Sequence, residues 1–379
     1  MTAAPDAGPA EPSRKQLAAN RRAERLFARL AGVAELRPSV GSRVAAISFA
    51  IVVHTVTLAL LTSGVLLIIL LPQTVGGWIC GPLLVVLAYK LRPRAPRLSE
   101  DARVVERAEA PDLYGLLDEL AARQGTRTID TVIVTTACNA ATSTYGWRGR
   151  RSLSIGAPLW AVLSPQQRLA VLAHETAHGA NGGLQHRLVV VTALDTLRRW
   201  YEVAHPLTSA RVLHSRPPGV RTLVDLVVPL HLVHRVGVTI IRRSAHRAEY
   251  LADQLAAEAA GTVAMIDALE QLPVARAAMA TLVKAVHARV PSHPWRLVRD
   301  LAAAVPQPER DRLAAEDEAE GVTVDATHPP NHLRVRMLRE RPQRTGTVKL
   351  EPERSARIDA ELAPRTVLLA DRVIAWARR

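Results

Sequence analysis

Hydrophobic residues are spread unevenly along this chain, and its two longest apolar runs lie near the N-terminus. Residues 44–71 contain no Asp, Glu, Lys or Arg. This run exceeds the roughly 20 residues that an α-helix needs to cross the hydrocarbon of a bilayer. A second run, residues 75–89, is shorter and contains three glycines and one proline. Because so few residues connect the two runs, the pattern predicts a transmembrane helical hairpin over residues 44–90.

Beyond residue 90 the pattern becomes that of a folded domain. Residues 110–124 have the spacing of a helix, and residues 130–136 have the composition of a strand. Residues 151–156 alternate between polar and apolar side chains, which predicts a strand at an exposed edge. We therefore expect an α+β fold, mainly α, with a small β-sheet in residues 91–345 and a helical C-terminal segment over residues 346–379.

One segment of this domain carries a pattern typical of metal chemistry. His174 and His178 are four residues apart on a predicted helix that begins at Ser164-Pro165. Both imidazoles then lie on one helix face and can reach one metal ion. Glu175 lies between them, where it can act as a general base toward water. The alternative is a helix with two hydrogen-bonded histidines and a surface glutamate.

A catalytic zinc site needs a third protein ligand and one open position. A histidine six residues after His178 would be one solution, but Leu184 occupies that position and His186 has the wrong spacing. A glutamate farther downstream, as in thermolysin-like enzymes, would be another. The nearest one, Glu202, follows a pair of arginines and has no acidic partner beside it. Both arrangements are therefore rejected.

Glu249 and Asp253 form a better candidate pair. They are four residues apart and share one face of a predicted helix, among small apolar residues that allow close helix packing. Glu249 can ligate the metal while Asp253 accepts the free N–H of a ligating histidine. The alternative is a solvated acidic pair beside Arg247. The occurrence of Glu249 and Asp253 together with the histidine pattern favours the ligand interpretation.

With these residues the chain resembles the membrane-bound zinc metalloprotease family that contains the heat-shock HtpX-like endopeptidases and the CAAX prenyl endopeptidases. The resemblance extends over residues 131–338, and its pieces occur in the family's order. They are Asn139-Ala140, His174 to His178 followed by Gly179-Ala180-Asn181-Gly182, Glu249 to Asp253, and Thr327-His328-Pro329-Pro330 with Arg334.

This resemblance implies a zincin-type (gluzincin) metalloprotease domain with Zn²⁺ as its cofactor. The implied metal ligands are His174, His178 and Glu249, and the implied catalytic residues are the base Glu175 with His328 and Arg334 near the cleft. His293 also precedes a proline and competes for the role of His328. His328 is preferred because only its motif is followed by an arginine that opens a basic helix, Arg334.

The resemblance also favours pairing of an extended substrate with the predicted edge strand, since an open strand edge binds peptide backbone with little side-chain selectivity. An ordinary hairpin is the alternative. The expected substrate-binding residues are Asn139, Ala140, Leu153, Ser154 and Ile155.

Charge predicts the orientation of the hairpin. The chain has a formal net charge of +14 at pH 7. Basic residues are dense in residues 1–43 and again directly after residue 89, whereas the turn of the hairpin is uncharged. The positive-inside rule therefore places this basic N-terminal tail and the catalytic domain in the cytoplasm. Nucleic-acid binding explains the excess poorly, because aromatic residues make up only 3% of the chain and no recognition motif is present.

Residues 184–241 form a predicted insertion between the second histidine and Glu249. Its longer apolar stretch, residues 223–241, contains Asp225 and Arg235. Either charge is costly in the centre of a membrane span. We therefore expect a membrane-associated helix or a lid over the active site instead of a simple span.

Together these features predict a multi-pass zinc endopeptidase of the cell membrane. Its expected partners are the lipid bilayer and polypeptide substrates, misfolded or membrane-associated, that are cleaved on the cytoplasmic face; no nucleic acid is expected. The alternatives are a dedicated processing protease of the CAAX prenyl type and a catalytically silent membrane scaffold. The CAAX type needs a large apolar chamber, for which the hairpin is too small. The sequence leaves the oligomeric state open.

Overall fold

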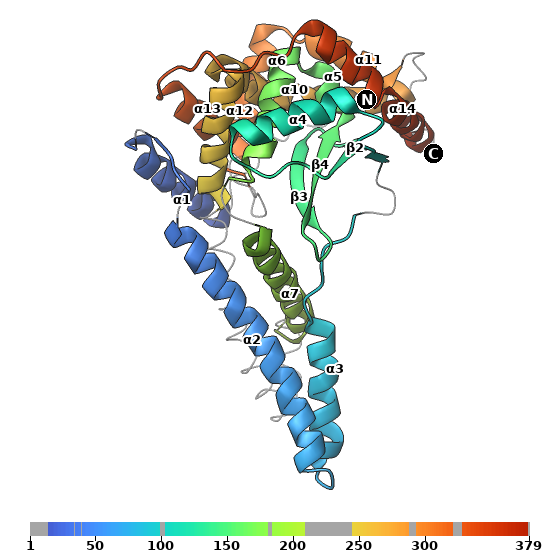
Figure 1. Ribbon diagram of the computed structural model, residues 1–379. Coiled ribbons are helices and arrows are strands. Elements are labelled where there is room, and N and C mark those ends of the chain that lie inside the picture. Colours follow the sequence, from blue (N-terminus) through green and yellow to red (C-terminus); the bar gives the residue numbers. More distant parts are fainter. Residues whose placement is uncertain are drawn as a thin grey trace, which may run out of the picture.

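A long helical stalk projects from a mainly helical head that also contains a small β-sheet (Figure 1). The computed structural model describes residues 14–33, 35–38, 40–98, 103–180, 184–208, 245–287, 293–320 and 328–377. The expected fold class, mainly α with a small sheet, is confirmed at this level.

The stalk is built on α2 (Val40–Leu70), which a short π-helix η1 (Gly76–Cys80) connects to α3 (Gly81–Leu91). α2 and α3 pack side by side and run in opposite directions (Figure 1). Two glycines allow this close approach. A Cβ atom on Gly64 would lie 2.8 Å from the carbonyl oxygen of Gly81, and one on Gly81 would lie 2.6 Å from Ile68 Cγ1.

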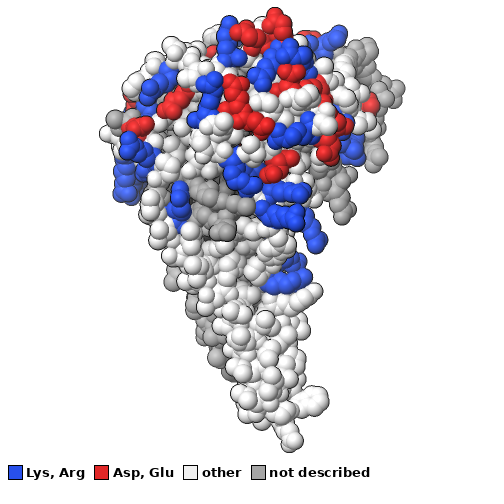
Figure 2. Space-filling view, in the orientation of Figure 1, with Lys and Arg blue, Asp and Glu red and all other residues white. Residues whose placement is uncertain are grey.

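Residues 43–70 of α2 have a mean hydropathy of 2.3 and are long and apolar enough to cross a membrane, whereas residues 76–91 form a shorter apolar helix. Large apolar side chains such as Leu58, Ile69 and Leu83 are exposed on the stalk. On the face shown in Figure 2, Lys, Arg, Asp and Glu cover the head and are absent from the lower stalk. Charge and hydrophobicity therefore divide the molecule between head and stalk.

α7 (Leu184–Thr208) lies along α2 and so belongs to the stalk (Figure 1). Its apolar face packs against α2 and α3 through Ala193, Leu197 and Trp200. His54, inside the apolar run of α2, lies with Nε2 3.2 Å from the carbonyl oxygen of Val189. The remainder of the predicted insertion, including residues 223–241, lies outside the described residues.

The sheet has the strand order β1-β2-β4-β3, where β2 and β4 are parallel and the other pairs are antiparallel. The strands are β1 (Arg103–Val105), β2 (Thr131–Thr135), β3 (Ala140–Tyr145) and β4 (Arg150–Gly156). The two strands expected from the sequence are present as β2 and β4.

The expectation that residues 151–156 form an edge strand is wrong. β4 is paired on both sides: Leu153 lies opposite Val132 of β2 and opposite Thr142 of β3. An alternating pattern reports which face of a strand is buried, but it carries no information on whether a neighbour occupies each edge. β3, which the sequence did not indicate, is the edge strand on this side of the sheet, and β1 is the edge strand on the other side.

α6 (Pro165–Ala177) lies in the hydrophobic core of the head, where its side chains Leu169 and Leu172 are fully buried. It packs between α4 (Pro111–Arg123) and α10 (Thr262–His287). The other helices of the head are α5 (Ala157–Val162), residues 245–260, α11 (Pro294–Ala303), α12 (Gln307–Glu320), α13 (Asn331–Arg339) and α14 (Pro352–Ala377).

α1 (Arg14–Ala31) packs against the head. Its apolar face buries Ala23, Phe27 and Leu30 against residues of the helix 245–260 and of α13. The basic tail predicted from the sequence therefore contains a helix whose apolar face is covered by protein.

Candidate metal centre

The local sequence of α6 sets where the candidate metal-binding helix begins. The side chain of Ser164 accepts a hydrogen bond from the backbone N–H of Gln167, whose side chain in turn accepts one from the backbone N–H of Ser164. Pro165 occupies the first helical position, where its missing N–H costs nothing. The helix start expected from the sequence is confirmed.

Two side chains from outside α6 hold its last turn, which carries the motif. Arg151 Nη2 donates to the carbonyl oxygens of Glu175 and Thr176 at 3.3 and 3.1 Å, and Gln124 Nε2 donates to that of Ala173 at 2.8 Å. A Cβ atom on Gly179 would lie 2.8 Å from Arg151 Nη1, so glycine leaves room for this contact. No local pattern could have revealed these two partners, because they come from α4 and β4.

Three potential ligands meet between α6 and the helix 245–260. The ligand atoms of His174, His178 and Glu249 all lie within 4.8 Å of one another. Nε2 of His174 is 3.4 Å from one carboxylate oxygen of Glu249, and Nε2 of His178 is 3.5 Å from the other. His174 and Glu249 are buried. Two imidazole nitrogens and a carboxylate oxygen are a donor set that binds divalent transition metals.

Asp253 lies behind His174, on the side away from Glu249. Its Oδ1 is 2.9 Å from Nδ1 of His174, which is the contact expected from the sequence. Arg334, from α13, binds the same carboxylate with both Nη2 and Nε, at 2.6 and 2.9 Å. Burial raises the pKa of Asp253, but Arg334 and His174 outweigh it and bring the pKa to about 2. Asp253 is therefore a carboxylate that fixes the orientation of His174.

His328 adds a second contact to the ligand carboxylate. Its Nδ1 is 2.6 Å from Oε2 of Glu249, and its side chain is 39% exposed. Burial opposes ionisation of Glu249, yet His178, His174 and His328 together hold its pKa well below the usual value. The competing candidate, His293, is instead the N-cap residue of α11.

The protonation of His174 in the metal-free site follows from the same groups. Burial and the charge of Arg334 lower its pKa, but the hydrogen bonds to Asp253 and Glu249 outweigh both and raise it to about 9. The carboxylates of Asp253 and Glu249 therefore favour positive charge at the position of His174.

Glu175 is the buried acid that these contacts leave free. It is 3% exposed, and its Oε2 atom has no hydrogen-bond partner among the described residues. A buried carboxylate oxygen without a partner is costly. It lines a cavity of about 370 Å³ together with His174, His328 and Arg334. A buried glutamate with an unpaired carboxylate oxygen therefore borders the cavity beside the ligand cluster, as a metal site with a general base requires.

The expected substrate-binding residues separate into two groups. Asn139 and Ala140, at the start of the edge strand β3, line this cavity. Leu153, Ser154 and Ile155 lie one strand farther in, hydrogen-bonded to β3. The free strand edge on which their expected role was based is therefore absent from β4, because β3 pairs with it. Cavity residues that the sequence did not indicate include Cys138, Arg276 and Asn331.

Comparison with known proteins agrees with this arrangement. Residues 108–342 match the sequence profile of peptidase family M48. The protein named Protease HtpX in Pseudomonas putida strains W619 and GB-1 is 29% identical to this chain over 132 residues. The matched region covers 34% of this chain and 45% of each relative, so the chain spans about half the length of the curated relatives it matches. No solved structure shows a significant match.

The family match extends over more than half of the chain. It includes both histidines of the motif, the ligand carboxylate of Glu249 and the ion pair between Asp253 and Arg334. On this evidence the chain belongs to peptidase family M48.

Proposed function

We propose that this protein is a membrane-anchored zinc endopeptidase with a zincin-type catalytic domain. The observation that carries the proposal is the convergence of His174, His178 and Glu249 beside the unpaired carboxylate oxygen of Glu175. A structural metal site is normally closed by four protein ligands, whereas a catalytic one keeps a position open. Three candidate ligands, of which His174 borders a cavity together with Glu175, favour the catalytic kind.

Zinc would be held by the two imidazoles and the carboxylate of Glu249. When bound, it supplies Lewis acidity, which acidifies water and polarises the carbonyl group of the scissile peptide. The remaining chemistry belongs to side chains of this chain. Glu175 accepts a proton from the attacking water at Oε2 and delivers it to the nitrogen of the leaving amine as the C–N bond breaks.

His328 and Arg334 have different roles in this proposal. His328 is partly exposed to the cavity, so its imidazole is placed to donate a hydrogen bond to the oxyanion that develops on the scissile carbonyl. Arg334 is committed to Asp253 through two hydrogen bonds. It therefore acts as a positioning residue that holds Asp253 against His174.

The substrate backbone would lie along β3. Among the described strands, β3 pairs with β4 alone, so its outer edge presents unpaired N–H and C=O groups. Asn139 and Ala140 bring the start of this edge into the catalytic cavity. Backbone pairing selects extended chains with little regard for their side chains. This suits the cleavage of misfolded or membrane-associated polypeptides.

α2 and α3 would anchor the enzyme in the cell membrane as a hairpin, with the head on the cytoplasmic side. The support is the apolar, uncharged surface of the lower stalk and the basic residues at the upper end of α3 and just after it, among them Lys90, Arg92 and Arg94. This distribution follows the positive-inside rule.

Replacement of Glu175 by Gln tests the activity. The variant should keep one zinc ion per chain but lose peptide hydrolysis, because the amide cannot accept the proton of water. A matched control is Glu202→Gln, which changes an exposed glutamate on α7 that pairs with Arg198; it should retain both properties. A wild-type protein that binds no zinc would instead support a catalytically silent scaffold, and unchanged hydrolysis by Glu175→Gln would contradict the assignment of the base.

A further inference from the structure

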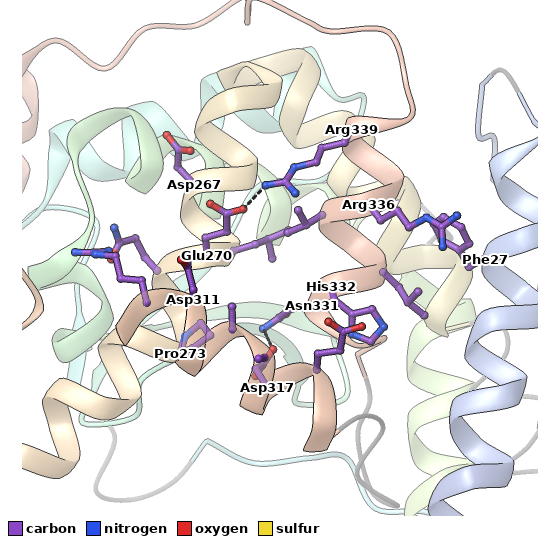
Figure 3. Close-up of a pocket in the computed structure, with 18 of the residues that line it drawn as sticks. Phe27, Asp267, Glu270, Pro273, Asp311, Asp317, Asn331, His332, Arg336 and Arg339 are labelled. Atoms are coloured by element: carbon purple, nitrogen blue, oxygen red, sulfur yellow. Dashed lines mark hydrogen bonds and ion pairs between the residues drawn. The ribbon is translucent and has the colours of Figure 1, made fainter. Parts of the chain in front are cut away.

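A second, larger cavity lies next to the candidate metal centre. Its volume is about 1370 Å³, and it is bordered by α1, α10, α12 and α13 (Figure 3). Leu269 and Asn331 line both this cavity and the smaller one at the metal ligands. The two cavities are therefore neighbours that share part of their walls.

Asp317 makes polar contacts where the two cavities adjoin. Arg276, which lines the catalytic cavity, binds the carboxylate of Asp317 at 3.0 Å, and Asn331 donates to it at 3.1 Å. The side chain of Arg276 is 54% exposed. The carboxylate of Asp317 is only 15% exposed, and Arg276 and Asn331 hold it where the two cavities adjoin.

The walls of the larger cavity carry an excess of negative charge. Seven carboxylates line it, against three guanidinium groups. Two of the three arginines are already neutralised inside the cavity: Arg339 pairs with Glu270 at 2.6 Å, as Figure 3 shows, and Arg336 pairs with Glu340 at 2.7 Å. The carboxylates are those of Glu24, Asp267, Glu270, Asp311, Asp317, Glu318 and Glu340.

Four of these acids, Glu24, Asp267, Asp311 and Glu318, form no ion pair with the described residues. Asp267, on α10, is half-buried, and burial raises its pKa above the usual value. Asp311, on α12, accepts a hydrogen bond from the uncharged side chain of Gln307 at 2.8 Å. Both side chains line the cavity (Figure 3). A cationic ligand would supply the positive charge that the protein does not place beside them.

We propose that this cavity is a substrate subsite that binds basic side chains of an extended polypeptide on one side of the scissile bond. The proposal rests on the endopeptidase function put forward above. The volume exceeds that of ordinary small-molecule sites, which reach about 1,000 Å³. Because the two cavities are neighbours, an extended polypeptide is long enough to reach both, whereas an isolated cation is not. Backbone pairing along β3 would bind the chain, and the acidic cavity would select substrates with lysine or arginine near the cleavage site.

The test compares three fluorescent peptides that share one apolar scissile segment and carry three arginines, three glutamines or three glutamates beside it. Each peptide is made in two orientations, with the three flanking residues either on the N-terminal side or on the C-terminal side of the scissile segment. Binding is measured by fluorescence anisotropy with the full-length, zinc-loaded Glu175→Gln protein in detergent. Cleavage is measured with protein that retains Glu175.

In one of the two orientations the arginine peptide should bind more tightly than the glutamine peptide, and the glutamate peptide more weakly. Replacement of both Asp267 and Asp311 by Asn should reduce the ratio of arginine to glutamine binding at least about threefold, as expected for the loss of two exposed charge contacts. The matched control, Asp371→Asn, removes an exposed carboxylate from α14 outside the cavity and should leave the ratio unchanged. Equal binding of the arginine and glutamine peptides in both orientations would overturn the proposal, as would an equal loss in the control.

A second measurement avoids reliance on the double variant. A photoreactive group next to the arginines should attach to residues of α10 or α12 in the Glu175→Gln protein, and attachment elsewhere would overturn the assignment. Failure of the proposed enzyme function would give a different result. The wild-type protein would then cleave none of the peptides, although the preference for binding the arginine peptide would persist. That result would contradict the proposed proteolysis and would leave the proposed site for basic peptides intact.

Discussion

At the scale of single residues, the geometry of the candidate metal site depends on a chain of buried contacts behind the ligands. Arg334 binds Asp253, Asp253 binds His174, and His174 faces Glu249 across the site. Each member has its charge compensated by the next one, which is the condition for burying ionised groups at tolerable cost. The residues that hold the ligands therefore matter for metal binding as well as the ligands themselves.

Replacement of Arg334 by Lys should weaken zinc binding about 10- to 100-fold, the usual effect of losing a partner behind a ligand. A lysine offers a single ammonium group in place of the two-pronged contact with Asp253. Competition with a metal chelator measures the affinity. Arg357→Lys, which changes an exposed arginine of α14 paired with Asp112, is the control; equal affinities of Arg334→Lys and wild type would contradict the role.

Cys138 lines the catalytic cavity, and burial raises the pKa of its thiol to about 11. The thiol is therefore neutral at physiological pH, and only its small thiolate fraction reacts with alkylating agents. In a Cys80→Ser background, the rate of alkylation should rise about tenfold per pH unit from pH 7 to pH 10, because the thiolate fraction grows in that proportion below the pKa. Mass spectrometry follows the reaction, and a rate that levels off near pH 8.5 would show an ordinary thiol.

At the scale of secondary-structure elements, α1 is linked to the helix that supplies Glu249. Beyond the apolar contacts of Phe27, the side chain of Gln254 accepts hydrogen bonds from the backbone N–H of Leu36 at 2.9 Å and from Arg341 at 2.7 Å. Gln254 directly follows Asp253 in the sequence. The segment before the stalk is therefore part of the framework of the site.

Replacement of Phe27 by Ala should lower the free energy of unfolding of the head by about 3 kcal/mol, the usual cost of truncating a buried phenylalanine. The same change should increase hydrogen exchange in residues 245–260, which lose packing against α1. Thermal unfolding and hydrogen-exchange mass spectrometry measure the two effects. Leu17→Ala, at a 42% exposed position of the same helix, should change neither one; equal effects of the two substitutions would argue against a supporting role for α1.

At the scale of the whole molecule, a stalk whose lower part is uncharged joins a charged head. If α2 and α3 form a membrane hairpin with the head in the cytoplasm, the turn between them must reach the opposite surface. In a background without Cys80 and Cys138, a cysteine placed at Gln73 in this turn should react with a membrane-impermeant maleimide on intact cells. A cysteine at Arg94, above the stalk, should react only after the cells are opened. The reverse pattern would contradict the orientation.

Much of this molecule follows from local sequence. The apolar run of α2, the capping box of α6 and the strands β2 and β4 are encoded by neighbouring residues, so spacing alone predicts them. The histidine motif works in the same way, because four residues of helix place two side chains on one face. The Glu249–Asp253 pair is local too, and its combination with the histidine motif favoured the ligand interpretation before the resemblance to a family implied it.

The remaining features depend on contacts between segments that are distant in sequence. Strand order is one of them: the hydrophobic pattern of β4 is the same whether or not β3 covers its edge, and the edge was therefore misplaced. Arg151, Gln124 and Cys138 reach the site from other elements, with nothing in their own surroundings to mark them. The acidic cavity needs four helices to come together. Helix periodicity and short motifs are set by bonds and contacts within a few residues, whereas cavities, edges and supporting contacts exist only after the chain has packed.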